Sequence, residues 1–185
     1  MIIQFCGMSG SGKTTIAGHV KQLLQQQNIP VEIIDGDEYR KVLCADLGFS
    51  KQDRNQNIRR LAFVASKLSQ YNIVAIICAI NPYEDIRQET ITKYPNVRTV
   101  YFDCALEVLI QRDTKGLYQK AMLPIGHPDK INNLTGINDP FEIPANPHLT
   151  ISTTTESIHH STQKLADFIL TNYSNAGPNN MGKPL

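Results

Sequence analysis

The segment from Gly7 to Thr14 constrains this chain more than any other, because it matches the pattern G-x-x-x-x-G-K-[ST] without interruption. An apolar run from Ile2 to Cys6 precedes the segment, and a stretch of helical period follows it. A strand, a glycine-rich loop and a helix in this order form a phosphate-binding loop, whose backbone N–H groups point at phosphate oxygens. The N-terminus of the following helix adds a dipole that favours anions. The sequence therefore predicts a phosphate-binding loop rather than glycines that serve only a tight turn.

The residue types of this loop each have a chemical role. Glycines let the backbone turn, Lys13 reaches the terminal phosphates of a nucleotide, and the Thr14 hydroxyl ligates Mg²⁺. We therefore expect ATP and Mg²⁺ to bind here. The predicted ATP contacts of the loop are Gly7, Ser9, Gly10, Ser11, Gly12, Lys13, Thr14 and Thr15.

Length and composition fit a single globular domain, since the 185 residues include 41% hydrophobic and 19% charged residues. Eighteen basic and seventeen acidic residues give a net charge of +1, which argues against a nucleic-acid-binding surface. No basic and then apolar leader precedes the first predicted strand, and no apolar stretch approaches the roughly 18 residues of a membrane span. We therefore expect a cytoplasmic protein without a nucleic-acid or membrane partner.

The four cysteines, Cys6, Cys44, Cys78 and Cys104, are far apart in the sequence and form no C-x-x-C pair. Most of them lie in apolar, strand-like runs. We therefore expect reduced thiols that pack in the interior.

Short apolar runs alternate with longer segments of helical period. The predicted strands are Ile2–Cys6, Val31–Ile34, Ile73–Ala79, Val97–Phe102 and Leu149–Ile151, and the predicted helices are Thr14–Gln27, Asp53–Tyr71, Tyr83–Tyr94, Ala105–Arg112 and Ser157–Tyr173. Ser50, three residues before Asp53, supplies a capping start for the second helix. Strands that crossover helices bury on both faces form a parallel sheet, so we expect a three-layer α/β fold of the P-loop NTPase type. Ligands of such folds bind at the carboxyl ends of the strands.

Two regions depart from this alternation. Residues 113–147 are rich in Pro, Gly, Asn and Asp and are too long for an ordinary connection, which favours a lid over a solvated excursion without a role. Residues 174–185 have little apolar content, so we expect a disordered tail there. The rest of the chain, residues 1–173, is predicted to form one domain.

A charged cluster follows the second predicted strand, where Asp35, Asp37, Glu38 and Arg40 lie within six residues. Charges at the end of a buried strand are costly unless they have partners. A Mg²⁺-bound nucleotide and an anionic acceptor would supply those partners, and a carboxylate here can orient the proton of an attacking hydroxyl. The alternative is structural, with Asp35 or Asp37 as a helix cap and Arg40 on the surface.

Several motifs in a fixed order resemble one known family. They are D-G-D-x-x-R at 35–40, D-L-G-F-S at 46–50, D-R-x-x-N-I-R-R at 53–60, I-N-P-Y at 80–83, R-D-x-K-G-L-Y at 112–118 and T-G-I-N-D-P-F-E at 135–142. This series, over roughly residues 2–150, closely resembles the adenylylsulfate kinases. The resemblance implies a single P-loop kinase domain over residues 1–173. It also implies transfer of the ATP γ-phosphoryl group to the 3′-hydroxyl of adenosine 5′-phosphosulfate, which gives 3′-phosphoadenosine 5′-phosphosulfate and ADP in sulfate assimilation.

The resemblance implies roles for residues near the transferred phosphoryl group. Lys13, Asp35 and Asp37 are the expected catalytic residues. Asp37 would orient the attacking hydroxyl, while Asp35 would hold the metal shell together with Thr14. Arg112 would contact ATP and, with Lys115 and Tyr118, form the base of the lid, whose closure would exclude water.

The resemblance also implies the contacts of the acceptor. Arg40 and Arg54 would clamp its phosphosulfate, because a planar guanidinium can donate two hydrogen bonds to an oxyanion. Phe49 would stack on the acceptor adenine, and Asn57 would form a hydrogen bond nearby. The predicted acceptor contacts are Asp37, Arg40, Phe49, Arg54, Asn57, Ile80, Asn81, Lys130, Leu134, Thr135 and Gly136.

Three residues depart from the family pattern. Asn81 stands where family members commonly have a serine that is phosphorylated in some of them, and an amide cannot form a phosphoester. We therefore expect direct, in-line transfer. The lid is a few residues longer than the usual stretch of the family, which ends in K-G-F-T-G-I. Leu134 stands where an aromatic side chain of the family would complete a stack on the adenine. Lys130 would take the place of the lysine in that stretch.

These departures leave two alternatives open. A related P-loop kinase would phosphorylate another nucleotide or sugar-nucleotide hydroxyl. The alternative from another class is a catalytically silent ATP-binding regulator, although the intact Lys13, Asp37 and Arg54 argue against it. Related kinases are often dimers, so the expected assembly is a homodimer.

Overall fold

Five parallel strands form the central sheet, and the computed structural model describes residues 1–174. The strands are β1 (Ile2–Cys6), β2 (Val31–Asp35), β3 (Val74–Cys78), β4 (Val97–Asp103) and β5 (Leu149–Ser152). They lie in the order β2-β3-β1-β4-β5, and every neighbouring pair is parallel. Each strand end lies within one residue of its predicted position.

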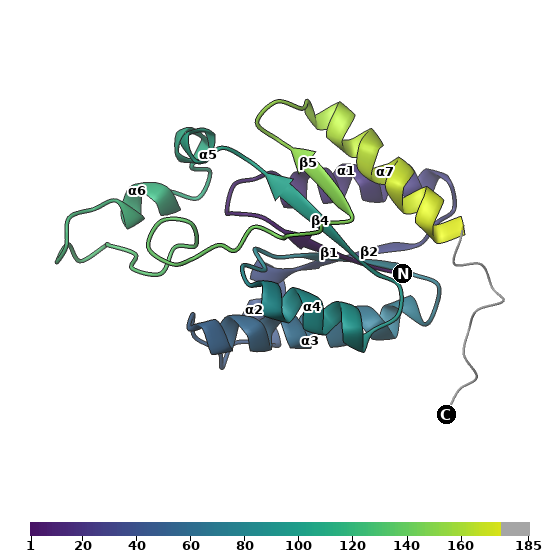
Figure 1. Cartoon of the computed structure of the whole chain (residues 1–185), viewed down its shortest axis with the longest axis horizontal. Helices are drawn as coiled ribbons and strands as arrows, with labels where there is room; N and C mark the ends of the chain where they lie inside the picture. Colours follow the sequence, from purple (N-terminus) through teal and green to yellow (C-terminus); the bar gives the residue numbers. More distant parts are fainter. Residues whose placement is uncertain (175–185) are drawn as a thin grey trace.

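Helices cover both faces of this sheet, so the molecule has three layers (Figure 1). One face carries α1 (Lys13–Gln26) and α7 (Ile158–Ser174), and the other carries α3 (Lys51–Ser69) and α4 (Glu84–Lys93). The shorter helices are α2 (Gly36–Val42), α5 (Leu106–Arg112) and α6 (Leu117–Ala121). The predicted three-layer α/β fold is thus confirmed.

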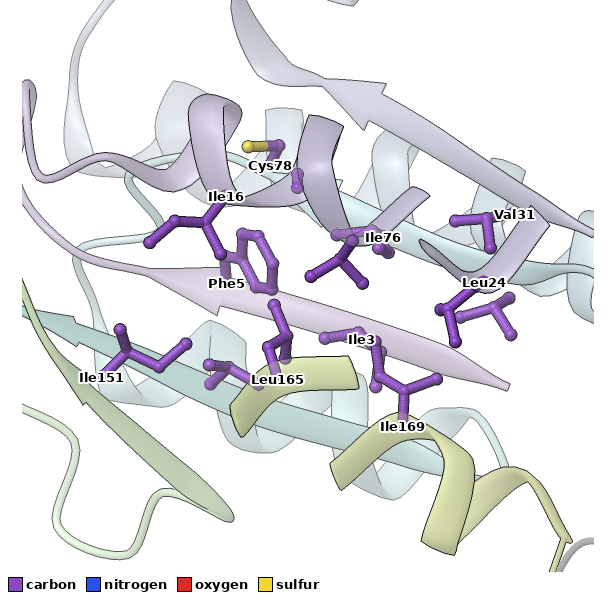
Figure 2. Close-up of a cluster of buried hydrophobic side chains, with 14 of the residues drawn as sticks. Ile3, Phe5, Ile16, Leu24, Val31, Ile76, Cys78, Ile151, Leu165 and Ile169 are labelled. Atoms are coloured by element: carbon purple, nitrogen blue, oxygen red, sulfur yellow. The ribbon is translucent and has the colours of Figure 1, made fainter. Parts of the chain in front are cut away.

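Separate hydrophobic cores lie on the two faces, because alternate side chains of a strand point to opposite sides of the sheet. In β1, Ile3 and Phe5 belong to the core beneath α1 and α7, whereas Ile2 packs with the core beneath α3. Figure 2 shows the first core, which includes Ile3 of β1, Ile76 of β3 and Leu165 of α7. Burial of one such side chain stabilises the fold by about 1.5–3 kcal/mol. The sheet is therefore a firm base for the loops at its carboxyl edge.

Two short helices, α2 and α6, were not predicted from the sequence. Asp35 is the N-cap of α2, since its Oδ1 accepts hydrogen bonds from the backbone N–H of Asp37 at 2.9 Å and of Glu38 at 3.3 Å. Inside the predicted lid, Asp113 Oδ1 accepts from the backbone N–H of Tyr118 at 3.0 Å in α6. α6 has only five residues, and α2 carries charged side chains at four of its seven positions, so neither shows an apolar helical period in the sequence.

The described residues bear on three further predictions. Within residues 1–174, no helix is both long enough and apolar enough to cross a membrane. All four cysteines lie in this part of the chain, and each is a buried free thiol, as predicted. The predicted disordered tail lies outside the described residues except for Ser174, the last residue of α7.

The predicted cap at Ser50 is confirmed, and α3 begins two residues earlier than predicted. Ser50 Oγ accepts a hydrogen bond from the backbone N–H of Asp53 at 3.1 Å.

We expect Ser50→Ala to lower the free energy of unfolding by about 1 kcal/mol, whereas Ser50→Gly should lower it by roughly a few tenths of a kcal/mol. Urea unfolding of both variants beside the wild type measures the difference. Equal losses in the two variants would contradict a stabilising cap.

Candidate active site

The phosphate-binding loop leads from the carboxyl end of β1 into the first turn of α1. Gly10 and Gly12 have φ values of 77° and 86°, in the left-handed region that favours glycine. Gly7 has no room for a side chain, because a Cβ atom there would lie 2.8 Å from the carbonyl oxygen of Phe102 in β4. The loop thus lies tightly against the sheet, with the free backbone N–H groups of the α1 N-terminus beside it.

Lys13 is the buried cation of this loop. Its Nζ donates to the carbonyl oxygens of Gly7 at 2.8 Å and Met8 at 2.7 Å, and to Ser11 Oγ at 3.1 Å. Burial lowers the pKa of Lys13 to about 8, because the ammonium group loses hydration. An anion beside Nζ would favour the charged form again, and the terminal phosphates of a nucleotide are such an anion.

Thr14 and Asp35 bring two oxygen atoms together at the end of β2. Thr14 Oγ1 donates to Asp35 Oδ2 at 3.2 Å and lies 3.5 Å from Cys78 Sγ at the end of β3. A hydroxyl and a carboxylate are the ligand types that Mg²⁺ prefers, so the pair fits the predicted metal site. Burial raises the pKa of the Cys78 thiol to about 11, because the thiolate would lose its hydration.

Asp37 in α2 pairs with Lys115, which lies between α5 and α6. The exposed fractions of the two side chains are 72% and 54%, so solvent weakens the pair and either partner can exchange it for a ligand. Both residues line the same pocket as the phosphate-binding loop. A carboxylate and an ammonium group therefore face the space where a phosphate donor and an acceptor would meet.

Two arginines surround Phe49. The guanidinium carbon of Arg40 lies 4.4 Å from the centre of the Phe49 ring, and that of Arg54 lies 5.6 Å from it. The ring remains 53% exposed, so part of its surface is free to stack on a planar ligand. Arg40 also donates to the carbonyl oxygen of Gly48, which holds the loop before α3.

Arg54 connects α3 to the predicted lid. Its side chain is largely buried, and Nη2 donates to the carbonyl oxygen of Asn133 at 2.6 Å and pairs with Asp139 Oδ2 at 3.2 Å. Nε donates to the carbonyl oxygen of Phe49 at 2.9 Å. The hydroxyl of Tyr83 donates to the same Asp139 carboxylate oxygen at 3.4 Å. One guanidinium group thus joins three segments around the pocket.

Three predicted acceptor contacts have buried side-chain oxygens that lack a hydrogen-bond partner within residues 1–174: Asn57 Oδ1, Asn81 Oδ1 and Thr135 Oγ1. A buried polar atom without a partner costs about 1–3 kcal/mol. A polar ligand that reaches these atoms would relieve that cost. Asn81 itself has a left-handed backbone, with φ 48°, and its Nδ2 donates to Gln4 Oε1 at 3.3 Å.

A single cavity of about 660 Å³ brings most of the predicted site residues together, and its volume is in the range of small-molecule sites. The predicted residues that line it are Ser9, Gly10, Gly12, Lys13, Thr14, Thr15, Asp35, Asp37, Phe49, Arg54, Ile80, Leu134 and Thr135. The loop at β1, the carboxylates after β2 and the turn after β3 therefore share one pocket with the predicted lid.

The other predicted residues lie outside this lining: Gly7, Ser11, Arg40, Asn57, Asn81, Arg112, Lys130 and Gly136. Arg112 Nη2 donates to the carbonyl oxygen of Thr153 at 2.7 Å, just after β5. Lys130 Nζ donates to the carbonyl oxygens of Ala121, at 3.0 Å, and Leu123. In this structure Lys130 therefore holds the lid segment together rather than lining the cavity.

The cavity lining also contains residues that were not among the predicted ligand contacts: Cys78, Ala79, Thr114, Lys115, Leu117, Ile131 and Asn133. Of these, Lys115 was predicted at the base of the lid, from its position in the R-D-x-K-G-L-Y motif. Cys78 and Ala79 come directly before Ile80, at a strand end where ligands bind. Asn133 contributes its backbone carbonyl to Arg54, and a side-chain pattern cannot reveal such a contact.

Known proteins match this chain over most of its length. The family model described as Adenylylsulphate kinase matches residues 1–152. The chain belongs to the adenylylsulfate kinase family. An adenylyl-sulfate kinase of Synechococcus sp. (strain JA-3-3Ab) is 43% identical over 156 residues, which cover 84% of this chain and 86% of that protein. An adenylyl-sulfate kinase of Chloroflexus aurantiacus is 42% identical over 153 residues, or 83% and 80% of the two chains.

A solved structure of the same family also matches. The Mycobacterium tuberculosis APS kinase in complex with AMPPNP and APS superposes with a TM-score of 0.84 at 34% identity, covering 91% of this chain and 96% of that chain. Adenylylsulfate kinases are ATP-dependent phosphotransferases, so the predicted family, fold and enzyme class are confirmed.

Because Lys13 is buried, we expect nucleotide binding to depend on pH. Phosphates beside Nζ would raise the pKa of Lys13 above its value of about 8 in the free protein, so binding would take up a proton above that pH. We expect the Kd for MgATP to increase about tenfold between pH 8 and pH 9.5. Calorimetric titrations in buffers of different ionisation enthalpy measure both the Kd and the proton uptake. A constant Kd over this range would contradict the assigned role of Lys13.

Proposed function

We propose that this protein is an adenylylsulfate kinase in sulfate assimilation, which transfers the γ-phosphoryl group of ATP to the 3′-hydroxyl of adenosine 5′-phosphosulfate (APS). The products are 3′-phosphoadenosine 5′-phosphosulfate and ADP. One observation carries the proposal: the phosphate-binding loop, Asp37, Phe49 and Arg54 all line one pocket. In such a pocket, donor and acceptor are held next to each other, which favours direct transfer over loss of the phosphoryl group to water. The complex of the Mycobacterium tuberculosis relative with AMPPNP and APS supports the same pair of substrates.

Lys13 and the backbone N–H groups of the loop would bind the β- and γ-phosphates of ATP. Nζ of Lys13 would exchange the carbonyl oxygens of Gly7 and Met8 for phosphate oxygens. Because Lys13 is buried, its charge acts with little screening on the negative charge that develops during transfer. Arg112, held at Thr153, would border the ATP from the side of β5.

Thr14 and Asp35 would hold Mg²⁺ through Oγ1 and Oδ2. Bound at this position, the ion would neutralise charge on the β- and γ-phosphates. The other oxygen of Asp35, Oδ1, accepts hydrogen bonds from the backbone N–H groups of Asp37 and Glu38 in α2. These bonds fix the direction in which Oδ2 points. The capping role and the metal-binding role of Asp35 are therefore compatible.

Asp37 would orient the 3′-hydroxyl of APS and accept its proton as the phosphoryl group is transferred. Lys115 pairs with Asp37 in this structure, and with ATP bound it would turn to the phosphates and release the carboxylate. Asn81 cannot carry a phosphoryl group, so the transfer would be direct and in line.

Acceptor recognition would come from the α2 and α3 side of the pocket and from the lid. Arg54 and Arg40 would bind the phosphosulfate, and Phe49 would stack on the adenine against the aliphatic Leu134. Asn57 Oδ1 would accept a hydrogen bond from a polar group of APS, and the Thr135 hydroxyl would donate or accept one. Ile80, Asn81 and Gly136 complete the proposed acceptor contacts, and Lys130 would join them by exchanging the carbonyl oxygens of Ala121 and Leu123 for APS.

The proposed setting is the cytoplasm, where ATP is abundant and thiols stay reduced, and the four buried free cysteines fit that environment. The proposed assembly is a homodimer, which sedimentation equilibrium would test. No nucleic-acid or membrane partner is part of the proposal.

Coupled ADP release from MgATP tests the proposed acceptor. We expect turnover at micromolar APS and much slower turnover with other nucleotides and nucleotide sugars at the same concentration. Activity with a nucleotide sugar but not with APS would contradict the proposed acceptor. ATP binding without turnover by any acceptor would favour a regulator instead.

Two substitutions separate the donor side from the acceptor side. Lys13→Ala should lower kcat by about 10²–10³, because it removes a cation that acts on the transition state. Arg54→Ala should mainly raise the KM for APS, by about tenfold to a hundredfold, because it removes a buried partner of an anion. Steady-state kinetics with each substrate varied in turn measures both effects.

Arg59→Ala is the matched control for Arg54→Ala. Arg59 lies on the same helix and pairs with Glu89 at 2.7 Å, and it does not line the pocket. Its replacement should leave both KM values unchanged. Small and equal effects of Lys13→Ala and Arg54→Ala would contradict the assigned sites.

A further inference from the structure

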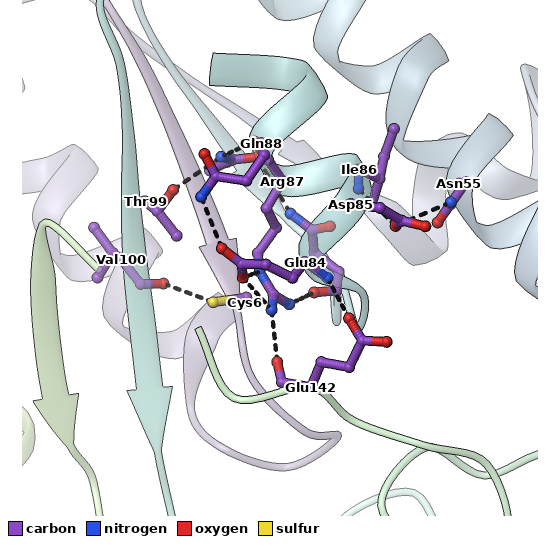
Figure 3. A network of polar contacts seen from close by, with 12 residues as sticks. Cys6, Asn55, Glu84, Asp85, Ile86, Arg87, Gln88, Thr99, Val100 and Glu142 are labelled. Carbon is purple, nitrogen blue, oxygen red and sulfur yellow. Dashed lines mark hydrogen bonds and ion pairs between the residues drawn. The ribbon is translucent and has the colours of Figure 1, made fainter. Parts of the chain in front are cut away.

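A network of buried polar groups lies at the start of α4, beside the active-site pocket (Figure 3). Its centre is Arg87, whose side chain is 1% exposed and does not line the pocket. A buried guanidinium group is stable only if partners satisfy its charge and its N–H groups. Because burying this charge costs free energy, the partners of Arg87 indicate which segments it holds in place.

Arg87 joins three separate segments. Its Nη1 donates to the carbonyl oxygen of Asn81 at 2.7 Å, and its Nη2 donates to the carbonyl oxygen of Glu142 at 2.6 Å. Nε and Nη2 bind Glu84 Oε2 at 2.9 Å and 2.6 Å. Asn81 directly follows Ile80, which lines the pocket, and Glu142 ends the motif T-G-I-N-D-P-F-E.

Glu142 also contacts the start of α4 directly, through its side chain and its backbone N–H. Its Oε2 accepts a hydrogen bond from the backbone N–H of Glu84 at 2.6 Å, and its own N–H donates to the carbonyl oxygen of Pro82 at 2.9 Å. Tyr83, the N-cap residue of α4, provides no side-chain cap. Glu142 thus supplies, from a distant part of the chain, an acceptor for the free N–H groups of α4.

Residues 139–142, which we call the strap, connect this network to the acceptor side of the pocket. At one end, Asp139 pairs with Arg54 at 3.2 Å. At the other end, Glu142 is held by Arg87 and by the first turn of α4. The strap therefore links the orientation of Arg54 to the position of Arg87.

Gln4 supports the network from the centre of the sheet. It is fully buried in β1, and its Nε2 donates to the carbonyl oxygen of Arg87 at 3.1 Å and to Thr99 Oγ1 at 2.9 Å. Its Oε1 accepts from Asn81 Nδ2 at 3.3 Å. The network is thus fixed to two central strands and has little freedom to shift.

We propose that Arg87 is a positioning residue for the acceptor. It fixes the turn at residues 80–82 and the strap, and through Asp139 it keeps Arg54 in one orientation. The identity of the acceptor as APS rests on the proposed function. Arg87 itself forms no hydrogen bond or ion pair with the phosphate-binding loop, Thr14 or Asp35. The turn that it fixes contacts the loop through one backbone hydrogen bond, from the N–H of Gly7 to the carbonyl oxygen of Ile80 at 3.0 Å, so we expect ATP binding to change much less than acceptor binding.

Arg87→Lys and Arg87→Gln test this role by kinetics. Lysine keeps the charge but cannot bridge three segments with a planar fork, and glutamine removes the charge. We expect the KM for APS to rise about tenfold, the equivalent of one lost hydrogen bond to a charged group, while the KM for ATP changes less than about twofold. Glu89→Gln is the control on the same helix, because Glu89 pairs with the partly exposed Arg59 of α3, and both KM values should stay unchanged.

Hydrogen exchange gives a readout that does not require the acceptor. Peptides that cover residues 136–143 should exchange faster in Arg87→Gln than in Glu89→Gln, while calorimetry shows unchanged ATP affinity in both. Parallel increases in both KM values, or unchanged exchange of the strap, would overturn the proposal. If the wild type fails to turn over APS, the proposed function fails, while exchange and ATP affinity still decide the role of Arg87.

Glu142→Gln covers the case in which Arg87→Gln does not fold. This substitution keeps the backbone contacts of the strap and removes only the charge that caps α4. We expect the same shifts at smaller size, with a higher KM for APS and faster exchange of the strap. An unchanged KM for APS in a folded Glu142→Gln protein would overturn the proposal.

Discussion

The burial of a parallel sheet on both faces is the constraint on which the rest of this structure depends. Because helices cover both faces, the only open positions for a ligand are at the strand ends. The loop after β1, Asp35 at the end of β2 and Ile80 after β3 come from distant parts of the sequence and meet there in one pocket. The apolar cores on the two sides thus position charged groups that do not take part in the packing themselves.

The cations of this pocket are all held by oxygen atoms of the protein. Lys13 donates to carbonyl oxygens of its own loop, Arg54 to the lid and to Asp139, and Lys115 to Asp37. A buried or half-buried cation without such partners would be costly. In the proposed function, binding of two anionic nucleotides would exchange the partners of Lys13 and Lys115. Arg54 would keep its contacts with the lid and the strap, which would hold it in place for the acceptor.

Local sequence patterns were sufficient for the strands, the phosphate-binding loop and the Ser50 cap, because each depends on neighbouring residues. They were insufficient for α6, which has five residues, and for α2, whose mostly charged sequence lacks an apolar period. Motif order identified Arg54 and Asp37, but the partners of Arg54 include the backbone of Asn133. The capping of α4 by Glu142 joins residues 58 positions apart, and only the folded chain reveals such a contact.

We propose that one pocket holds both nucleotides, with donor phosphates on the loop and the acceptor between α3 and the lid. A crystal structure with a non-hydrolysable ATP analogue and APS bound tests this arrangement. We expect the γ-phosphate beside Lys13, the phosphosulfate on Arg54 and the 3′-hydroxyl beside Asp37. An acceptor bound elsewhere, with Phe49 and Arg54 free of ligand, would contradict it.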